Sequence, residues 1–311
     1  MTALHRLVVI LGPTASGKSA LAIALAERLN GEVVACDSTQ VYRYFDIGTG
    51  KVPAAERHGI RHHMIDLVEP EEIFTAGEYR RRATEVLEAI CARGKLPILT
   101  AGTGLYLRAL LEGLAEAPAR SEELRERLRQ RVARHGREHV HGILKRLDPG
   151  SALRIAPGDT QKVIRAIEIR LLSGQPAGAL HQRGRASLEG FRVLKIGLMP
   201  PRATLYRRIE QRVTAMLDGG WLEEAKILLG KGIAPISKPF DFLGYAQLWD
   251  VLAGKMAFDD AVRQIEQATR RYAKRQMTWF RKESDVFWIE GFGDAPAVAA
   301  EAFRLIAAVV E

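Results

Sequence analysis

Residues 6–19 read RLVVILGPTASGKS, and this stretch decides the fold. Its first six residues form a short apolar run, rich in β-branched side chains and ended by a glycine, which is typical of a buried parallel strand. The next eight match the pattern G-x-x-x-x-G-K-[ST]. Residues 20–29 are rich in Ala and Leu and predict a helix that ends at Asn30-Gly31. A glycine-rich loop between a strand and a helix is the context in which this motif binds phosphate groups.

The loop predicts a site for a diphosphate or triphosphate. Its backbone N–H groups turn toward an anion, and the positive end of the following helix adds to the attraction. Lys18 supplies a mobile positive charge, and the Ser19 hydroxyl is placed to hold Mg²⁺. We therefore expect phosphate contacts from Gly12, Pro13, Thr14, Ala15, Ser16, Gly17, Lys18 and Ser19.

Strand-like and helix-like segments alternate along most of the chain and predict an α/β fold, a P-loop NTPase-like parallel sheet flanked by helices. From Ser121 to Leu172, however, apolar residues recur only at helical spacing, and residues 173–190 are typical of a loop. We expect a small all-helical insertion domain at 116–190 within a catalytic core formed by 1–115 and 191–311. Further strands are predicted at 32–37, 96–100, 191–198 and 286–289, and further helices at 78–93, 105–111, 200–217 and 261–282.

Charge and composition narrow the classes of function. The 311 residues carry a net charge of +9, and residues 120–190 hold 15 Lys and Arg against 8 Asp and Glu. This basic insertion predicts either a polyanion-binding surface or a solvated helical face. Two cysteines exclude a disulfide framework and a cysteine-based zinc site. No early apolar run is long enough to cross a bilayer, so we expect a cytoplasmic protein with no membrane segment.

Asp37 is the acidic residue expected nearest to the phosphate loop. It ends the strand at 32–37, whereas the strand at 96–100 ends in Ala-Gly-Thr-Gly and lacks the acid of a kinase or ATPase. Ligands of parallel sheets lie outside the carboxyl ends of the strands, so Asp37 should face the crevice of the loop. It is a candidate Mg²⁺ ligand or general base, and the alternative is a helix N-cap.

Several segments together carry a resemblance to one family. Gly-Pro-Thr-Ala-Ser-Gly-Lys-Ser at 12–19 is followed by Asp-Ser-Thr-Gln-Val-Tyr at 37–42 and by Gly-Thr-Gly-Leu-Tyr at 102–106. Arg208-Ile-Glu-Gln-Arg212, Gly244-Tyr245 and Lys-Arg-Gln-Met-Thr-Trp at 274–279 come later, in the same order. In these motifs the chain resembles the tRNA dimethylallyltransferases over nearly its whole length.

The resemblance implies a reaction, in which the dimethylallyl group of dimethylallyl diphosphate passes to N6 of the adenosine 3′-adjacent to the anticodon and diphosphate is released. It implies that Asp37 is the base on N6, that Thr103 contacts the target nucleotide, and that Arg212 absorbs charge on the leaving group. The target base must leave its stack to reach such a crevice. The anticodon stem-loop of tRNA is the implied partner, with contacts at Asp37, Ser38, Thr39, Gln40, Thr103, Arg125, Gln161, Lys162, Val163, Ile164 and Arg165.

The sequence departs from the family pattern at Ala101, where a glycine is common, and at Ala246, where a basic residue is usual. The second change weakens an RNA role for residues 240–246, so Phe242 and Tyr245 are interpreted as core residues. We also expect Trp249 and Trp279 to pack helices, and we do not interpret His62-His63 as a metal pair, because no matching carboxylate triad is evident. The chain is expected to be a monomer with no obligate protein partner.

Three other functions stay open at this point. An adenylate isopentenyltransferase shares the loop and the donor but alkylates a free nucleotide. A P-loop kinase transfers a γ-phosphate and needs no RNA, and a non-catalytic RNA-binding protein with a regulatory nucleotide site does not need Asp37. The basic insertion and the arginine-rich segment at 263–275 favour an RNA substrate over the free nucleotide of an adenylate isopentenyltransferase, and the other two functions stay open.

Overall fold

The structure is a computed structural model that describes residues 4–182, 186–233 and 237–308. It divides the chain into two compact units, Met1–Leu111 with Leu188–Glu311 and Glu112–Ser187. We call these the core unit and the insertion unit. The insertion unit begins and ends a few residues before the limits of 116 and 190 expected from the sequence. Within it, Arg165 donates a hydrogen bond to the carbonyl of Pro118 at 3.0 Å.

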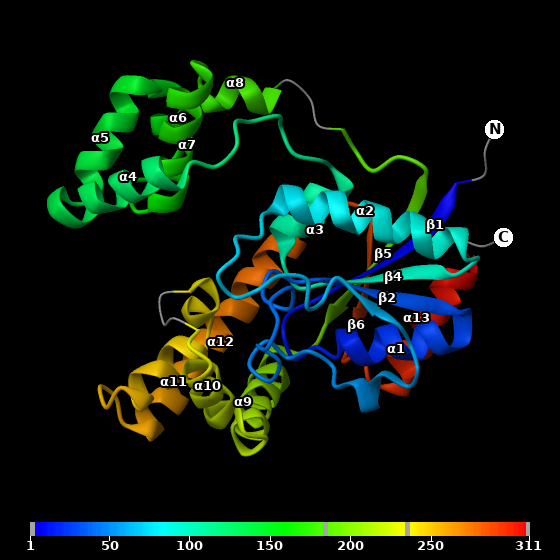
Figure 1. The fold of residues 1–311 in the computed structure, drawn as a ribbon. Coiled ribbons are helices and arrows are strands. Elements are labelled where there is room, and N and C mark those ends of the chain that lie inside the picture. The colour runs from blue at the N-terminus through cyan, green and yellow to red at the C-terminus, as the bar shows by residue number, and fades with distance from the viewer. Residues whose placement is uncertain (1–3, 183–185, 234–236, 309–311) are drawn as a thin grey trace. The chain divides into compact units, whose positions relative to one another are not determined.

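The core unit is built on one six-stranded sheet in the order β3-β2-β4-β1-β5-β6 (Figure 1). Every neighbouring pair is parallel, so the predicted parallel sheet is confirmed. The first strand lies between two others in a register that pairs Val8 with both Ile98 and Leu194. The strands are β1 (His5–Leu11), β2 (Gly31–Cys36), β3 (His62–His63), β4 (Leu96–Ala101), β5 (Phe191–Met199) and β6 (Val286–Glu290).

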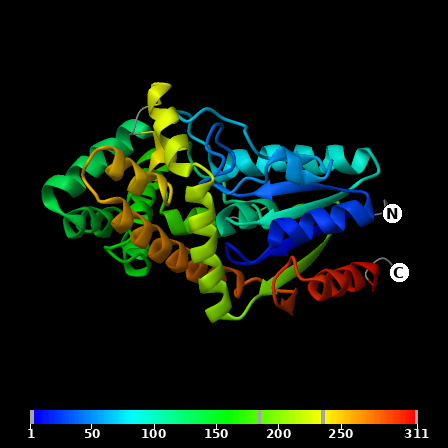
Figure 2. The ribbon, with the colours of Figure 1, turned by 90° about the horizontal axis from the view of Figure 1, so that it is seen from below.

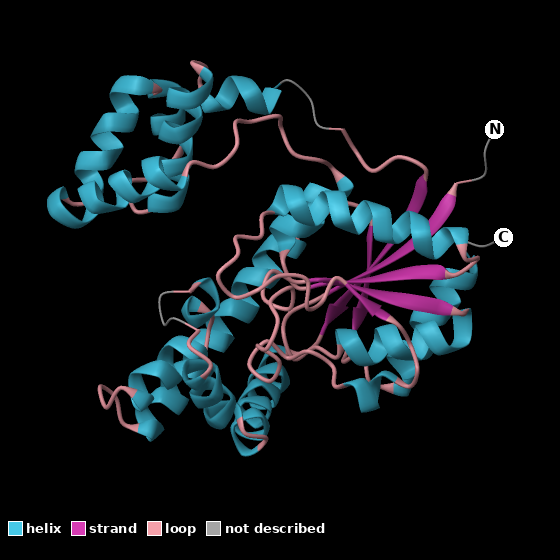
Figure 3. Cartoon of the chain, in the orientation of Figure 1, coloured by secondary structure: helices cyan, strands magenta, loops and turns pink. Residues whose placement is uncertain are grey.

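Side chains of β1 point alternately to the two faces of the sheet and contribute to a hydrophobic core on each face. Leu7, Val9 and Leu11 pack with α2 (Ala76–Ala92) and α3 (Gly104–Leu111). Val8 and Ile10 face the other way and pack with α1 (Lys18–Leu29) and α13 (Pro296–Ala308). Successive side chains of a strand point to opposite faces, so a continuous apolar run is required where both faces are covered. Figure 3 shows the resulting helix–sheet–helix layering of the core unit.

Four helices of the core unit lie beyond the carboxyl ends of the strands (Figures 1 and 2). The longest of them, α12, bonds to the loops that follow both β1 and β4. These helices thus form the outer wall of the crevice at the end of the sheet. They are α9 (Arg202–Asp218), α10 (Trp221–Gly230), α11 (Tyr245–Leu252) and α12 (Phe258–Phe280), with the 3₁₀ turn η2 (Lys238–Asp241) before α11 and a second 3₁₀ turn, η1 (Ala54–Arg57), near β3.

The insertion unit is helical in its described residues. A compact apolar core, which includes Leu128, Leu144 and Ile167, holds its helices together. Among the described residues of the whole chain, no helix is both long and apolar enough to cross a membrane. The helices are α4 (Glu122–His135), α5 (Arg137–Leu147), α6 (Pro149–Arg154), α7 (Thr160–Ser173) and α8 (Ala177–Gln182), so a helix stands at 177–182 where the sequence predicts loop.

Candidate functional site

The phosphate loop packs tightly at its back against the turn after β6. A Cβ atom at Gly17, whose φ is +85°, would come within 2.8 Å of the backbone N of Gly293, so only glycine fits there. That same N–H donates to the carbonyl of Ser16 at 2.8 Å. The next residue, Asp294, accepts two hydrogen bonds from Arg208 of α9, at 2.8 and 2.6 Å. The turn after β6 and helix α9 therefore fix the loop from outside.

Two cations, Lys18 and Arg212, lie close together at this loop. The Lys18 ammonium donates to the carbonyls of Gly12 and Pro13, both at 2.8 Å, and Arg212 reaches the Thr14 hydroxyl at 3.4 Å. Burial, together with the charge of Arg212 and against the charge of Asp37, lowers the pKa of Lys18 to about 7. Burial also lowers the pKa of Arg212. An anion placed between the two cations would relieve their repulsion, so the arrangement favours a ligand with several negative charges.

Asp37, Ser38 and Thr103 are brought together where β2 and β4 end. Asp37 Oδ1 accepts hydrogen bonds from the backbone N–H and the hydroxyl of Thr39, at 2.8 and 2.6 Å. A turn follows, so Asp37 does not cap a helix. Thr103 Oγ1 accepts from the N–H of Ser38 at 3.0 Å and lies 3.2 Å from its hydroxyl. The carboxylate is thus held by one oxygen, and its other oxygen, Oδ2, takes no part in these bonds.

Gly102 makes room for that second oxygen. A Cβ atom built on Gly102 would lie 2.3 Å from Asp37 Oδ2, well inside any real contact distance. The backbone after β4 therefore passes directly beside the carboxylate, which explains why this strand ends without a side chain at that point.

Helix α12 supplies site residues that the sequence did not point to individually. Gln276 accepts a hydrogen bond from Thr14 N at 2.8 Å and donates to the carbonyl of Gly102 at 2.8 Å, and the Tyr272 hydroxyl donates to the same carbonyl at 3.2 Å. Gln276 therefore ties the phosphate loop to the end of β4. Its only sequence signal was the motif at 274–279, since 262 positions separate it from Thr14.

Most of these groups line one cavity of about 510 Å³ in the core unit, whereas the predicted site residue Thr103 is not part of the lining and bonds to Ser38, which is. The phosphate loop contributes Lys18 and Ser19, and the segment from Asp37 to Gln40 forms a second polar wall. Part of the remaining wall is apolar and includes Ile209, Val213, Met216, Trp221, Phe242 and Leu243. The rest is polar and includes Arg212, Asp241, Gln247, Tyr272, Arg275 and Gln276.

A second depression, of about 1040 Å³, opens on the other side of the same loop. It shares Lys18, Ser19 and Arg212 with the first cavity. The Ser19 hydroxyl, the candidate Mg²⁺ ligand, thus faces the space around the phosphate loop. Groups of three or more His, Cys, Asp or Glu that would hold a metal by themselves do not occur in the part of the chain that the structure describes.

Some of the insertion residues that the family resemblance assigns to RNA contacts are exposed, and others are buried or paired within the unit. Gln161 and Lys162 are exposed at the start of α7, whereas the side chains of Val163 and Ile164 are buried in the core of the unit. Arg125 makes two hydrogen bonds, of 2.9 and 2.8 Å, to the fully buried carboxylate of Glu168, which also accepts from Arg165. Both arginines therefore have a partner inside the unit, and Lys162, although exposed, forms an ion pair with Asp159.

The structure shows where the aromatic residues expected in the core and the His62-His63 pair lie. Tyr245 is fully buried, as expected of a core residue, but Phe242 is only half-buried and faces the cavity. The two tryptophans predicted to pack helices, Trp249 and Trp279, pack against the main core. His62 and His63 form the short edge strand β3, where His63 lies 2.6 Å from the buried Glu32, and no metal group of the kind noted above includes them in the described chain.

A glycine-rich loop between a strand and a helix, with two cations and a carboxylate at the end of a parallel sheet, has the features of the P-loop class of proteins. A family model described as IPP transferase matches residues 40–283. The chain is 52% identical over 300 residues to a tRNA dimethylallyltransferase of Koribacter versatilis, covering 96% of this chain and 97% of the relative. On this basis the chain belongs to the IPP transferase family.

Solved structures agree with this assignment. The full-length tRNA isopentenylpyrophosphate transferase from Bacillus halodurans is 37% identical, with a TM-score of 0.72 and coverage of 98% of this chain and 96% of that one. A eukaryotic dimethylallyltransferase acting on tRNA is 28% identical, with a TM-score of 0.82 and coverage of 97% of this chain and 78% of that one. The fold described above is thus shared along almost the entire chain.

Proposed function

We propose that this protein transfers the dimethylallyl group of dimethylallyl diphosphate to N6 of the adenosine 3′-adjacent to the anticodon of tRNA, with release of diphosphate. The observation that carries the proposal is the single cavity that joins a phosphate loop, a carboxylate and an apolar wall. A five-carbon prenyl diphosphate has a diphosphate group that suits the phosphate loop and an apolar chain that suits the apolar part of the wall. The names of the relatives support the same reaction.

The phosphate loop and its two cations bind the leaving group. As the bond between the allylic carbon and the diphosphate oxygen breaks, negative charge grows on the diphosphate. Lys18, Arg212 and the N–H groups at the start of α1 stabilise that charge because they are already in place around it. Residues from Gly12 to Ser19 are the proposed diphosphate contacts, and Thr14 links them to Arg212.

Asp37 acts on the acceptor. Its Oδ1 is saturated by Thr39, so Oδ2 is the oxygen that takes a proton from the exocyclic amine as the N6–carbon bond forms. Thr103 and Ser38, which bond to each other beside it, are the proposed contacts to the flipped nucleotide, along with Thr39 and Gln40. Because an amine conjugated to a ring is a weak nucleophile, its position relative to the carboxylate is the main contribution of these residues.

The insertion unit is the proposed tRNA-binding domain. Its charge supports phosphate contacts, and the exposed Gln161 and Lys162 stand at the start of α7, which the carboxylate of Asp159 caps by accepting from the N–H of Lys162. Arg125 and Arg165 join this surface in the proposal, with Glu168 fixing their direction. Val163 and Ile164 are buried, so any contact they make with RNA goes through the backbone.

We further propose Mg²⁺ as the cofactor and the cytoplasm, where tRNA is found, as the compartment. A divalent cation held by the Ser19 hydroxyl and by diphosphate oxygens would neutralise part of the leaving-group charge. The absence of a carboxylate cluster in the described chain fits such a site, in which the substrate supplies most ligands. A monomer is the proposed state in solution.

One assay separates the candidate functions. The protein is incubated with labelled dimethylallyl diphosphate and either unmodified tRNA or AMP. Label in tRNA alone is the expected result; label in AMP would identify an adenylate isopentenyltransferase, and no transfer would contradict the proposal. Asp37→Asn should remove transfer and leave tRNA affinity nearly unchanged. Normal turnover of this variant at saturating tRNA would contradict the role of the carboxylate.

A further inference from the structure

A loop that follows β2, residues 45–50, forms one wall of the cavity although none of the proposed chemistry uses its side chains. Gly48, Thr49 and Gly50 are among the residues that line the cavity. Gln40, from the polar wall, donates hydrogen bonds of 3.2 Å to the carbonyls of both Thr49 and Gly50. The course of this loop therefore shapes the site directly.

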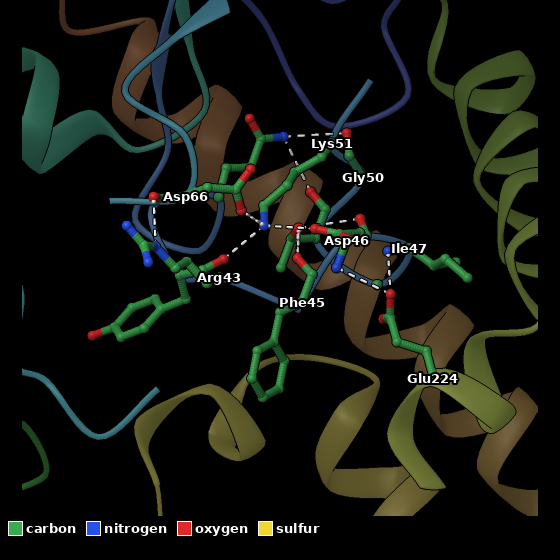
Figure 4. A network of polar contacts seen from close by, with 12 residues as sticks. Arg43, Phe45, Asp46, Ile47, Gly50, Lys51, Asp66 and Glu224 are labelled. Atoms are coloured by element: carbon green, nitrogen blue, oxygen red, sulfur yellow. Dashed lines mark hydrogen bonds and ion pairs between the residues drawn. The ribbon is translucent and has the colours of Figure 1, made fainter. Parts of the chain in front are cut away.

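Lys51 holds the loop from within (Figure 4). Its side chain is only 3% exposed, and its ammonium donates to the carbonyl of Tyr42 at 2.6 Å, to Asp46 at 2.7 Å and to Asp66 at 2.5 Å. An ammonium has three N–H donors, and each has an acceptor here. A buried charge is tolerated only when it is paired and hydrogen-bonded in this way. Lys51 thus fastens both ends of the loop to the segment that carries Asp66.

A second anchor comes from helix α10. One oxygen of Glu224 accepts from the N–H groups of Asp46 and Ile47, at 3.1 and 2.9 Å, as Figure 4 also shows. Its other oxygen accepts from the hydroxyl of Tyr245 at 2.5 Å, and that hydroxyl in turn accepts from the N–H of Gly48 at 3.1 Å. The loop is therefore fixed on two sides by charged groups, and its backbone has little freedom to move.

The fixed loop presses against the arginine of the phosphate site. Gly50 has a φ of +64°, and a Cβ atom built on it would lie 2.0 Å from Arg212 Nη2. The guanidinium is therefore packed directly on the backbone of Gly50, while its other end reaches Thr14. A shift of the loop would leave a gap beside Arg212 or push it out of place.

We propose that Lys51 is a positioning residue for the diphosphate site: by clamping residues 45–50 it keeps the backbone of Gly50 against Arg212 and so aims the guanidinium at the leaving group. This inference rests on the proposed role of Arg212 in binding diphosphate. A merely structural role for Lys51 predicts lower stability but no special dependence on Arg212.

A double-mutant cycle tests the proposal through the affinity for inorganic pyrophosphate, measured by calorimetry on folded protein. Lys51→Met is expected to weaken binding by about tenfold when Arg212 is present and by less than about twofold in an Arg212→Ala background. Equal losses in both backgrounds would overturn the proposal. If wild-type protein binds pyrophosphate but transfers no prenyl group, the proposed function fails instead, and the cycle still decides the role of Lys51.

Two further variants keep the test valid if Lys51→Met fails to fold. Asp46→Asn keeps an acceptor for Lys51 but removes its negative charge, at a side chain that is 61% exposed, so the protein should fold, and a smaller loss that again depends on Arg212 is expected. Arg43→Met is the matched control. Arg43 belongs to the same network through the carbonyl of Asp66 and Glu69, but it does not touch residues 45–50. A loss in Arg43→Met as large as in Lys51→Met would also overturn the proposal.

Discussion

The lowered pKa of Lys18 predicts that binding of the prenyl diphosphate weakens as the pH rises above neutrality. With a pKa of about 7, Lys18 is protonated in about a quarter of the protein molecules at pH 7.5 and in about 0.3% at pH 9.5. A bound diphosphate raises the pKa of Lys18 again, because it places negative charge beside the ammonium. Binding therefore takes up a proton in this range, and the Kd should rise by up to about 80-fold between these two pH values.

The measurement is isothermal calorimetry with a non-hydrolysable analogue of dimethylallyl diphosphate, without divalent ions, from pH 7.5 to 9.5. Titrations at pH 8.5 in buffers of different ionisation enthalpy should show uptake of about one proton per ligand. Lys18→Met is the control, and its weaker affinity should vary little with pH. A wild-type Kd that changes less than about threefold, with no proton uptake, would refute the reasoning, since it would mean that Lys18 keeps one charge state throughout.

Three shorter predictions concern other parts of the chain. Gly102→Ala should lower kcat for transfer by at least about tenfold with little change in stability, since its methyl group displaces Asp37 Oδ2; steady-state kinetics and a melting curve decide it. Glu168→Gln should lower the free energy of unfolding by about 3 kcal/mol in urea denaturation, because Arg125 and Arg165 lose a buried counter-charge; a change below about 0.5 kcal/mol would contradict this. Affinity for tRNA should fall steeply with salt in filter-binding assays, and a flat response would exclude the insertion unit as the RNA surface.

The sequence predicts the structure best where a binding motif lies directly beside a clear hydrophobic pattern. β1, the phosphate loop and α1 follow from one continuous stretch, because a strand covered on both faces must be apolar throughout and the loop must be rich in glycine. The position of Asp37 beside this loop follows from the parallel order of the strands. These local rules needed no knowledge of distant residues.

Other features have no local signal. β3 has only two residues, His62 and His63, and it exists because they pair with Val33 and Val34 at the edge of the sheet rather than because of their own pattern. α8 is a six-residue helix in a segment rich in glycine and proline, so no long periodicity marks it. Gln276 meets Thr14 only through the packing of α12. Such contacts depend on tertiary structure and are invisible to local sequence patterns.

The contact between Gly17 and the turn after β6 has a consequence for the order in which the site forms during translation. Gly293 and Asp294, which pack against the phosphate loop, and Gln276, which bonds to it, are translated long after the loop itself. A nascent chain therefore carries the loop without these contacts until β6 and the turn after it have left the ribosome. We expect the loop to bind a prenyl diphosphate only once that strand and turn have packed against it.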